Sequence, residues 1–136
     1  MLSDPQARLP SFPRNSYLEY HYPVAIKTGT SHGYRDAWTI GWSDTYLVGV
    51  WVGHHDFQPT KELGGFNAAA PVVQDIFAFL HTDRKEGLNN ITFQPPPEYK
   101  PFRINTLTGE LNSEHAPFST TVYLKPGTEP VVYSSI

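Results

Sequence analysis

Three short stretches of the sequence carry side chains whose types suggest chemistry. Residues 27–31 read Lys-Thr-Gly-Thr-Ser and follow the short apolar run 24–26 directly. An ammonium group with neighbouring hydroxyl donors can form charge-assisted hydrogen bonds to a carboxylate. Ser31, His32 and Asp36 include the residue types of a hydrolytic triad, and residues 54–56, His-His-Asp, include those of a metal site.

The triad and the metal site are the weaker hypotheses. Ser31 and His32 are adjacent where a predicted strand gives way to a loop, and nothing in that spacing orients a base toward a nucleophile. Adjacent residues of a strand point to opposite faces, so His54 and His55 are poorly placed to share one ion. The sequence has no cysteine, which excludes a disulfide framework and a cysteine-ligated zinc site. We therefore expect no metal, and residues 27–31 are the candidate site.

Composition limits the class of protein. The 136 residues are 39% hydrophobic and 14% aromatic, enough for the modest core of one domain or of part of a larger one. Ten basic and thirteen acidic residues give a net charge of −3 without a basic cluster, which argues against nucleic-acid binding. No stretch approaches the roughly 18 apolar residues of a membrane span, and residues 1–8 do not read as a signal peptide.

The pattern predicts three antiparallel strands within residues 24–54, after an irregular, proline-containing lead-in at 1–23. Residues 36–42 alternate, so Trp38 and Ile40 should share one face and Ala37 and Thr39 the other. Residues 46–52 are apolar on both faces, as expected of a strand covered on both sides. The tryptophans are expected to pack in the core or on the strand surface rather than to form a sugar-binding platform; they are Trp38, Trp42 and Trp51.

A helix is predicted over residues 67–86, with Pro71 in its first turn and Gly87 as its stop. Its apolar stripe should face the sheet, and its members are Val72, Val73, Ile76, Phe77 and Leu80. Residues 88–136 read as a proline-rich connector followed by a β-rich extension, with a hairpin at Thr108-Gly109 and a strand at 121–124. The predicted fold class is α+β, with the division between the two parts at residues 1–87 and 88–136.

Lys27-Thr28-Gly29, continued by Thr-Ser and then by Arg-Asp-Ala-Trp at 35–38, carries a family resemblance. It is similar to the third motif of penicillin-binding proteins and class A β-lactamases. The longer string most resembles the class A, bifunctional penicillin-binding proteins of the 1C type. Residues 24–80 look like the end of their transpeptidase domain, and Gly-Thr-Glu-Pro at 127–130 looks like the element that closes their C-terminal region.

The resemblance implies roles for this stretch. Lys27 would supply an ammonium, and Thr28 and Thr30 hydroxyls, to the terminal carboxylate of a D-Ala-D-Ala stem peptide or to a β-lactam. Gly29, without a Cβ, would let the substrate lie against the strand edge. The backbone amide of Thr30 would be one oxyanion-hole donor, and the nucleophile's own amide the second. Arg35 and Asp36 are expected to shape the adjoining loop, and no cofactor is implied.

The other two motifs of the family are missing from the sequence. No serine has a lysine three residues later, and no serine or tyrosine has an asparagine two residues later. The nucleophile is therefore expected upstream, and this chain alone should not be acylated. The resemblance also implies a parent anchored on the outer side of a bacterial inner membrane, with a glycosyltransferase domain further upstream.

The sequence alone leaves two other interpretations open. One is a DD-carboxypeptidase or serine β-lactamase of the same fold, and the other is a non-catalytic, β-rich module that binds cell wall or protein. Separation from upstream sequence would leave the Lys27 strand as an open sheet edge, so self-association through that edge is expected.

Overall fold

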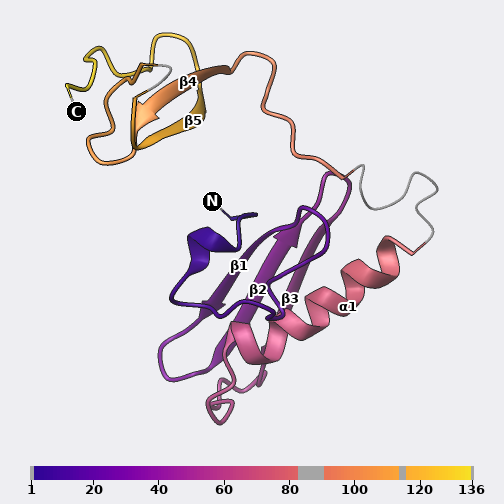
Figure 1. Ribbon diagram of the computed structural model, residues 1–136. Coiled ribbons are helices and arrows are strands. Elements are labelled where there is room, and N and C mark those ends of the chain that lie inside the picture. Colours follow the sequence, from indigo (N-terminus) through magenta and orange to yellow (C-terminus); the bar gives the residue numbers. More distant parts are fainter. Residues whose placement is uncertain (1, 83–90, 114–115, 136) are drawn as a thin grey trace. The chain divides into compact units, whose positions relative to one another are not determined.

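The computed structural model describes residues 2–82, 91–113 and 116–135, and the chain divides into two compact units, Met1–Phe93 and Gln94–Ile136 (Figure 1). The first unit contains a three-stranded sheet and a helix, and the second a two-stranded sheet. The α+β class expected from the sequence is confirmed. The predicted division after residue 87 lies outside the described residues.

The three-stranded sheet is formed by β1 (Ala25–Thr30), β2 (Asp36–Trp42) and β3 (Leu47–Gly53) in the order β1-β2-β3. Both pairings are antiparallel, as predicted. The turn between β2 and β3 is closed by the buried Ser43, whose hydroxyl accepts hydrogen bonds from the amides of Thr45 (3.3 Å) and Tyr46 (3.2 Å). A hydroxyl that satisfies turn amides in this way explains the sharp reversal of the chain.

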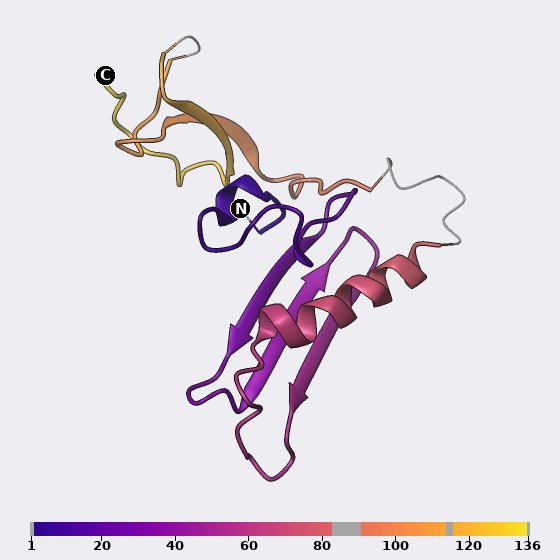
Figure 2. The same cartoon turned by 60° about the horizontal axis from the view of Figure 1, so that its bottom comes forward.

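One face of the sheet is covered by helix α1 (Ala70–Leu80), which runs across it (Figure 2). Ala37 and Thr39 on β2 are buried on this side, while Trp38 and Ile40 are 47% and 43% exposed on the other. The predicted alternation of β2 is therefore confirmed. Among the described residues of the first unit, α1 and its connections cover one side of the three-stranded sheet.

The prediction that β3 is covered on both faces is wrong for the described chain. Val48 is buried toward α1, but Leu47 and Trp51 on the other face are 74% and 42% exposed. A strand with apolar side chains on both faces can be packed on both faces. The described part of the chain covers only one face of β3. The face of Trp38, Ile40, Leu47 and Trp51 is called the open face below.

The helix begins differently from the prediction. Residues Gly65–Ala69 form one turn of π-helix, η2, and regular α-helix starts only at Ala70. The helix ends at Leu80, short of residue 86, because residues 81–82 form a turn; the remaining predicted positions, 83–86, lie outside the described residues. Pro71 occupies the first turn, where its missing amide proton has no helical partner to bond.

The apolar stripe of α1 is narrower than predicted. Val73 and Phe77 are fully buried, Ile76 and Leu80 pack against the core at its margin, and Val72 is exposed. Val72 lies about 100° around the helix from Val73, which turns it away from the sheet. The buried core that results is small, and its members are Leu18, Val24, Ile26, Val48, Ala70, Val73 and Phe77.

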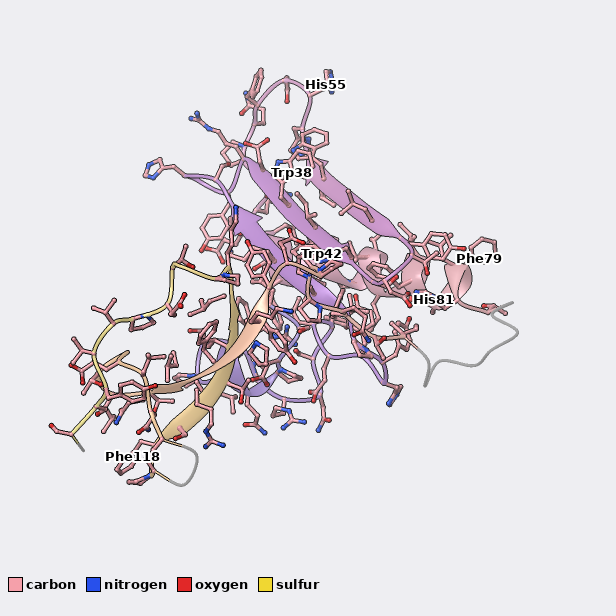
Figure 3. All side chains as sticks on the ribbon, turned by 90° about the horizontal axis from the view of Figure 1, so that it is seen from above. Trp38, Trp42, His55, Phe79, His81 and Phe118 are labelled. Atoms are coloured by element: carbon pink, nitrogen blue, oxygen red, sulfur yellow. The ribbon has the colours of Figure 1, made fainter. Side chains whose placement is uncertain are left out.

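His81 ties the end of the helix to the β2–β3 turn, a role that the sequence did not reveal. It is 5% exposed, and its Nε2 lies 3.2 Å from the Ser43 hydroxyl. The rings of Tyr22, Tyr46 and Phe77 surround it, with centroids 5.1, 5.3 and 6.1 Å from its own. In Figure 3 His81 and Phe79 both lie at the end of α1, and Phe79 is largely exposed.

The second unit pairs β4 (Lys100–Asn105) with β5 (Ser119–Leu124) in antiparallel register. The predicted hairpin at Thr108-Gly109 is present, with the Asn105 amide donating to the Glu110 carbonyl at 2.8 Å. The buried Asn105 organises this turn, because its Oδ1 accepts hydrogen bonds from the amides of Leu107 (2.8 Å) and Thr108 (3.3 Å).

Candidate functional site

The candidate site lies on β1, which is an edge strand. Its register with β2 pairs Lys27 with Ile40, Thr28 with Thr39 and Gly29 with Trp38. Side chains of a strand alternate between faces, so Lys27 shares the open face and Thr28 and Thr30 lie on the face toward α1. A ligand that meets the lysine and both threonines must therefore lie along the outer edge of β1, where the two faces meet.

The backbone of β1 presents hydrogen-bonding groups to that outer edge. The Ile26 amide donates to the Leu2 carbonyl (3.0 Å) rather than to β2. In an antiparallel pair the backbone groups of alternate residues point to the same side. The amides of Thr28 and Thr30 therefore point away from β2 as well, toward the position that an added strand would occupy.

Lys27 places a positive charge at this edge. Its side chain is exposed, and its ammonium donates a hydrogen bond to the Thr28 carbonyl at 2.5 Å. Beside Lys27 and Thr28 lies a hollow of about 230 Å³, bounded on its other side by the N-terminal segment through Leu9 and Phe12. The outer edge of β1 thus combines a long cationic side chain with backbone amides that point away from the sheet. Beside it lies a space with apolar walls.

Gly29 is not required by the folding of the described chain. A Cβ added there would lie 3.7 Å from the Cβ of Trp38, which is ordinary van der Waals contact, and the backbone of Gly29 is not in the left-handed region. The glycine at this position therefore leaves an unfilled space on the open face, and the packing of the described chain does not require that space. That room is available to a ligand lying against β1.

Gly65 is a different case, because the fold leaves no room for a side chain there. It is buried behind β1, where its amide donates to the Thr30 hydroxyl at 3.1 Å and its carbonyl accepts from the Thr39 hydroxyl at 2.8 Å. A Cβ at Gly65 would lie 2.2 Å from the Trp38 carbonyl oxygen. The only local sequence signal for this close approach is the glycine pair, Gly64-Gly65, just before the helix.

The hypothetical triad residues have structural roles instead. The Ser31 hydroxyl accepts the Asp36 amide at 2.8 Å, and the Ser31 amide donates to the Asp36 carbonyl at 2.9 Å, which closes the β1–β2 connection. The Asp36 carboxylate accepts the indole N–H of Trp51 at 2.9 Å. His32 is exposed in the turn. These bonds use Ser31 and Asp36 to shape the loop.

His54 and His55 follow the end of β3 and lie in a loop, so the expectation that they lie on a strand is wrong. His55 is at the tip of that loop, well separated from Trp42 at the far end of β2 (Figure 3). Within residues 2–82, 91–113 and 116–135, no group of three or more His, Cys, Asp or Glu side chains is arranged to hold a metal ion. Across the same ranges, no helix is both long and apolar enough to cross a membrane.

The Asp36–Trp51 bond gives the first unit a pH-dependent stability. Hydrogen bonds from the Trp51 indole, and then from the Ser31 hydroxyl, lower the pKa of Asp36. A carboxyl whose pKa is lower in the folded than in the unfolded state stabilises the fold above its unfolded pKa of about 3.9. That stabilisation is lost as the pH falls through the lower, folded value.

We therefore expect Asp36→Asn to flatten the acid dependence of stability. Urea unfolding at about pH 7 and about pH 3 should show a smaller loss of the free energy of unfolding for the variant than for the original chain. Asn keeps an oxygen that can accept the indole N–H, so the comparison isolates the charge. Equal losses in the two proteins would contradict this account.

Comparison with known proteins extends the family resemblance of residues 27–38. No model of a known protein family matches the chain. Over 114 residues, 82% of this chain, it is 33% identical to penicillin-binding protein 1A of Aquifex aeolicus, of which the match covers 15%. Over 54 residues, 40% of the chain, it is 46% identical to penicillin-binding protein 1C of Escherichia coli, of which the match covers 7%.

A solved structure agrees with these relatives. The chain resembles the crystal structure of penicillin-binding protein 1A from Haemophilus influenzae with a TM-score of 0.64 and 25% identity, over 82% of this chain and 16% of that one. Fold and motif thus define the chain as a relative of the penicillin-binding proteins. More narrowly, it corresponds to the C-terminal part of the transpeptidase region of the class A proteins, types 1A and 1C, with the stretch that follows it. It spans less than a fifth of the length of these relatives.

Proposed function

We propose that this chain forms the carboxylate-binding wall of a penicillin-binding, serine-type D-Ala-D-Ala transpeptidase. The outer edge of β1 supports this assignment most directly. It combines the exposed Lys27 ammonium with outward-pointing amides at Thr28 and Thr30, next to a glycine that the fold does not require. An extended peptide with a terminal carboxylate matches that arrangement of charge and backbone.

In the proposed reaction a serine outside this chain attacks the penultimate D-alanine carbonyl, and the last D-alanine leaves. The acyl group then passes to the amine of a neighbouring stem peptide or to water. Lys27 and the hydroxyls of Thr28 and Thr30 hold the terminal carboxylate, and the Thr30 amide donates to the oxyanion. A β-lactam would acylate the same serine, and no cofactor takes part.

The open face of the sheet supports a role within a larger domain. It carries half-exposed tryptophans, Trp38 and Trp51, on the same face as the Lys27 side chain. Apolar groups of this size on one sheet face are typical of a surface that other parts of a protein cover. We propose that residues 1–87 complete a transpeptidase domain in this way and that residues 88–136 are the linker and extension. The intact protein would work outside the cytoplasmic membrane, with a glycosyltransferase domain upstream.

The first test is labelling with a fluorescent penicillin. The isolated chain is expected to form no covalent adduct, because no serine in it has a lysine three residues later. The full open reading frame that encodes the chain should form one, at a serine of an upstream Ser-x-x-Lys motif. Denatured samples of both proteins control for non-covalent retention of the dye.

The other possible labelling results distinguish the alternative functions. An adduct on the isolated chain would refute the upstream position of the nucleophile. An unlabelled full-length protein would favour a non-catalytic, β-rich binding module. Labelling followed by rapid hydrolysis of the adduct, without transfer to an added amine, would favour a carboxypeptidase or β-lactamase.

A further inference from the structure

Gly65 lies directly behind the residues that we assign to carboxylate binding. A Cβ placed on it would come within 2.7 and 2.9 Å of the carbonyl oxygen and amide nitrogen of Gly29, and 2.2 Å from the carbonyl oxygen of Trp38. These are backbone atoms of the hydrogen-bonded pair Gly29–Trp38. The turn at Gly65 therefore packs against the backbone of β1 and β2 with no side chain between them.

The hydrogen bond from Gly65 to Thr30 determines what the Thr30 hydroxyl can do. A threonine hydroxyl has one proton to donate and two lone pairs to accept with. Because the Gly65 amide donates to Oγ1 at 3.1 Å, the hydroxyl serves as acceptor toward the interior. Its single proton is then left for a partner on the outer side, where the amide of Thr30 also points.

The position of Gly65 is itself held from both sides. Thr39 is fully buried, and its hydroxyl donates to the Gly65 carbonyl at 2.8 Å. On the preceding residue, the Gly64 amide donates to Oδ1 of Asn67 at 2.6 Å. Further upstream, the buried Thr60 bonds the Tyr34 carbonyl through both its amide (2.8 Å) and its hydroxyl (2.6 Å), which anchors the loop that leads to Gly65.

We propose that Gly65 and Thr39 are positioning residues for the Thr30 hydroxyl. The chain of bonds runs from the Thr39 hydroxyl to the Gly65 carbonyl, and from the Gly65 amide to the Thr30 hydroxyl. It keeps Oγ1 in place as a donor to the carboxylate of a peptide or β-lactam at the edge of β1. This inference rests on the proposed function and assigns to it two residues that do not themselves touch the ligand.

The test compares acylation of the full-length protein by a fluorescent penicillin and by its methyl ester, which lacks the charged carboxylate. The measured quantity is the ratio of the two second-order rate constants. Thr39→Val removes the hydroxyl with little change in volume and should lower this ratio about tenfold, the effect of one lost hydrogen bond to a charged group. Thr39→Ser keeps a hydroxyl and should restore the ratio to within about twofold.

This ratio separates positioning from general damage to the fold, because damage would slow both compounds alike. An unchanged ratio in Thr39→Val, with a reduced ratio in Thr30→Val, would overturn the inference and leave the proposed function intact. An unchanged ratio in Thr30→Val itself would instead refute the carboxylate-binding role of Thr30. Absence of labelling in the original protein would refute the proposed function.

The isolated chain gives a second readout that does not depend on activity. Amide hydrogen exchange at Gly65, measured by NMR, should become at least about tenfold faster in Thr30→Val, because the amide loses its acceptor, and should stay near the original rate in Thr30→Ser. Exchange at Ile26, whose amide bonds to Leu2, serves as the internal reference. Equal exchange at Gly65 in all three proteins would overturn the proposed bond to Thr30.

Discussion

Replacing Gly65 by alanine is expected to prevent stable folding of the first unit, or to cost it at least about 4 kcal/mol. The new Cβ would lie 2.2 Å from the Trp38 carbonyl oxygen, far inside van der Waals contact. The atoms in its way belong to the backbone of two paired strands, so relief requires breaking the ladder or moving the helix start. Urea unfolding of the chain, followed by tryptophan fluorescence, measures the loss.

The matched control is Gly29→Ala, a glycine whose backbone belongs to the same contact but whose Cβ would point to the opposite face of the sheet. Its Cβ would point to the open face and meet Trp38 at 3.7 Å, so the free energy of unfolding should change by no more than about 0.5 kcal/mol. In the full-length protein the same substitution should nevertheless abolish penicillin labelling, because the methyl group would fill the space left for the ligand. Equal losses of the free energy of unfolding in the two variants would contradict the assignment of a structural role to Gly65 and a ligand-binding role to Gly29.

The sequence was most informative where residues repeat with the period of an element. The alternation of residues 36–42 predicted which side of β2 is buried, and Ala37 and Thr39 are indeed fully buried. The same reasoning failed for β3, because the apolar character of Leu47 and Trp51 reflects a cover that the described residues do not provide. The pattern of apolar residues indicates which faces of a strand can be packed. The surrounding chain determines whether those faces are in fact covered.

The site was predictable only in part, for a related reason. Lys27 to Thr30 form a contiguous motif, which a single sequence can reveal. The support behind them depends on hydrogen bonds from Thr39 and to Thr30 that span 26 and 35 residues of sequence. Such bonds leave no local periodicity, and the glycine pair that makes them sterically possible reads as an ordinary loop.

The two faces of β1 carry different groups for the proposed binding of a carboxylate. The face toward α1 carries the threonines, and the Gly65 amide there donates a hydrogen bond to the Thr30 hydroxyl. The open face carries Lys27, whose side chain is long and exposed, with its ammonium at the Thr28 carbonyl on the edge. A positioned hydroxyl donor combined with a long ammonium side chain suits a carboxylate that moves slightly as the serine attacks the adjoining amide carbonyl and the C–N bond breaks.

Replacing Lys27 by methionine is expected to slow penicillin acylation of the full-length protein at least about a hundredfold. Methionine preserves most of the side-chain length and removes the ammonium that pairs with the carboxylate. Because Lys27 is exposed, the free energy of unfolding of the chain should change by no more than about 0.5 kcal/mol. Second-order rate constants for labelling, measured beside urea unfolding curves, test both parts of the prediction.

Two further variants show whether the effect is specific to this position. Lys61→Met removes another exposed lysine of the first unit, outside β1, and should label at the original rate. Lys27→Arg keeps the charge but replaces a compact ammonium by a planar guanidinium, so it should recover only part of the loss. Labelling of Lys27→Met at the original rate would place carboxylate recognition elsewhere in the protein. A recovery to the full rate by Lys27→Arg would show that charge alone is sufficient and that the shape of the ammonium at this edge is unimportant.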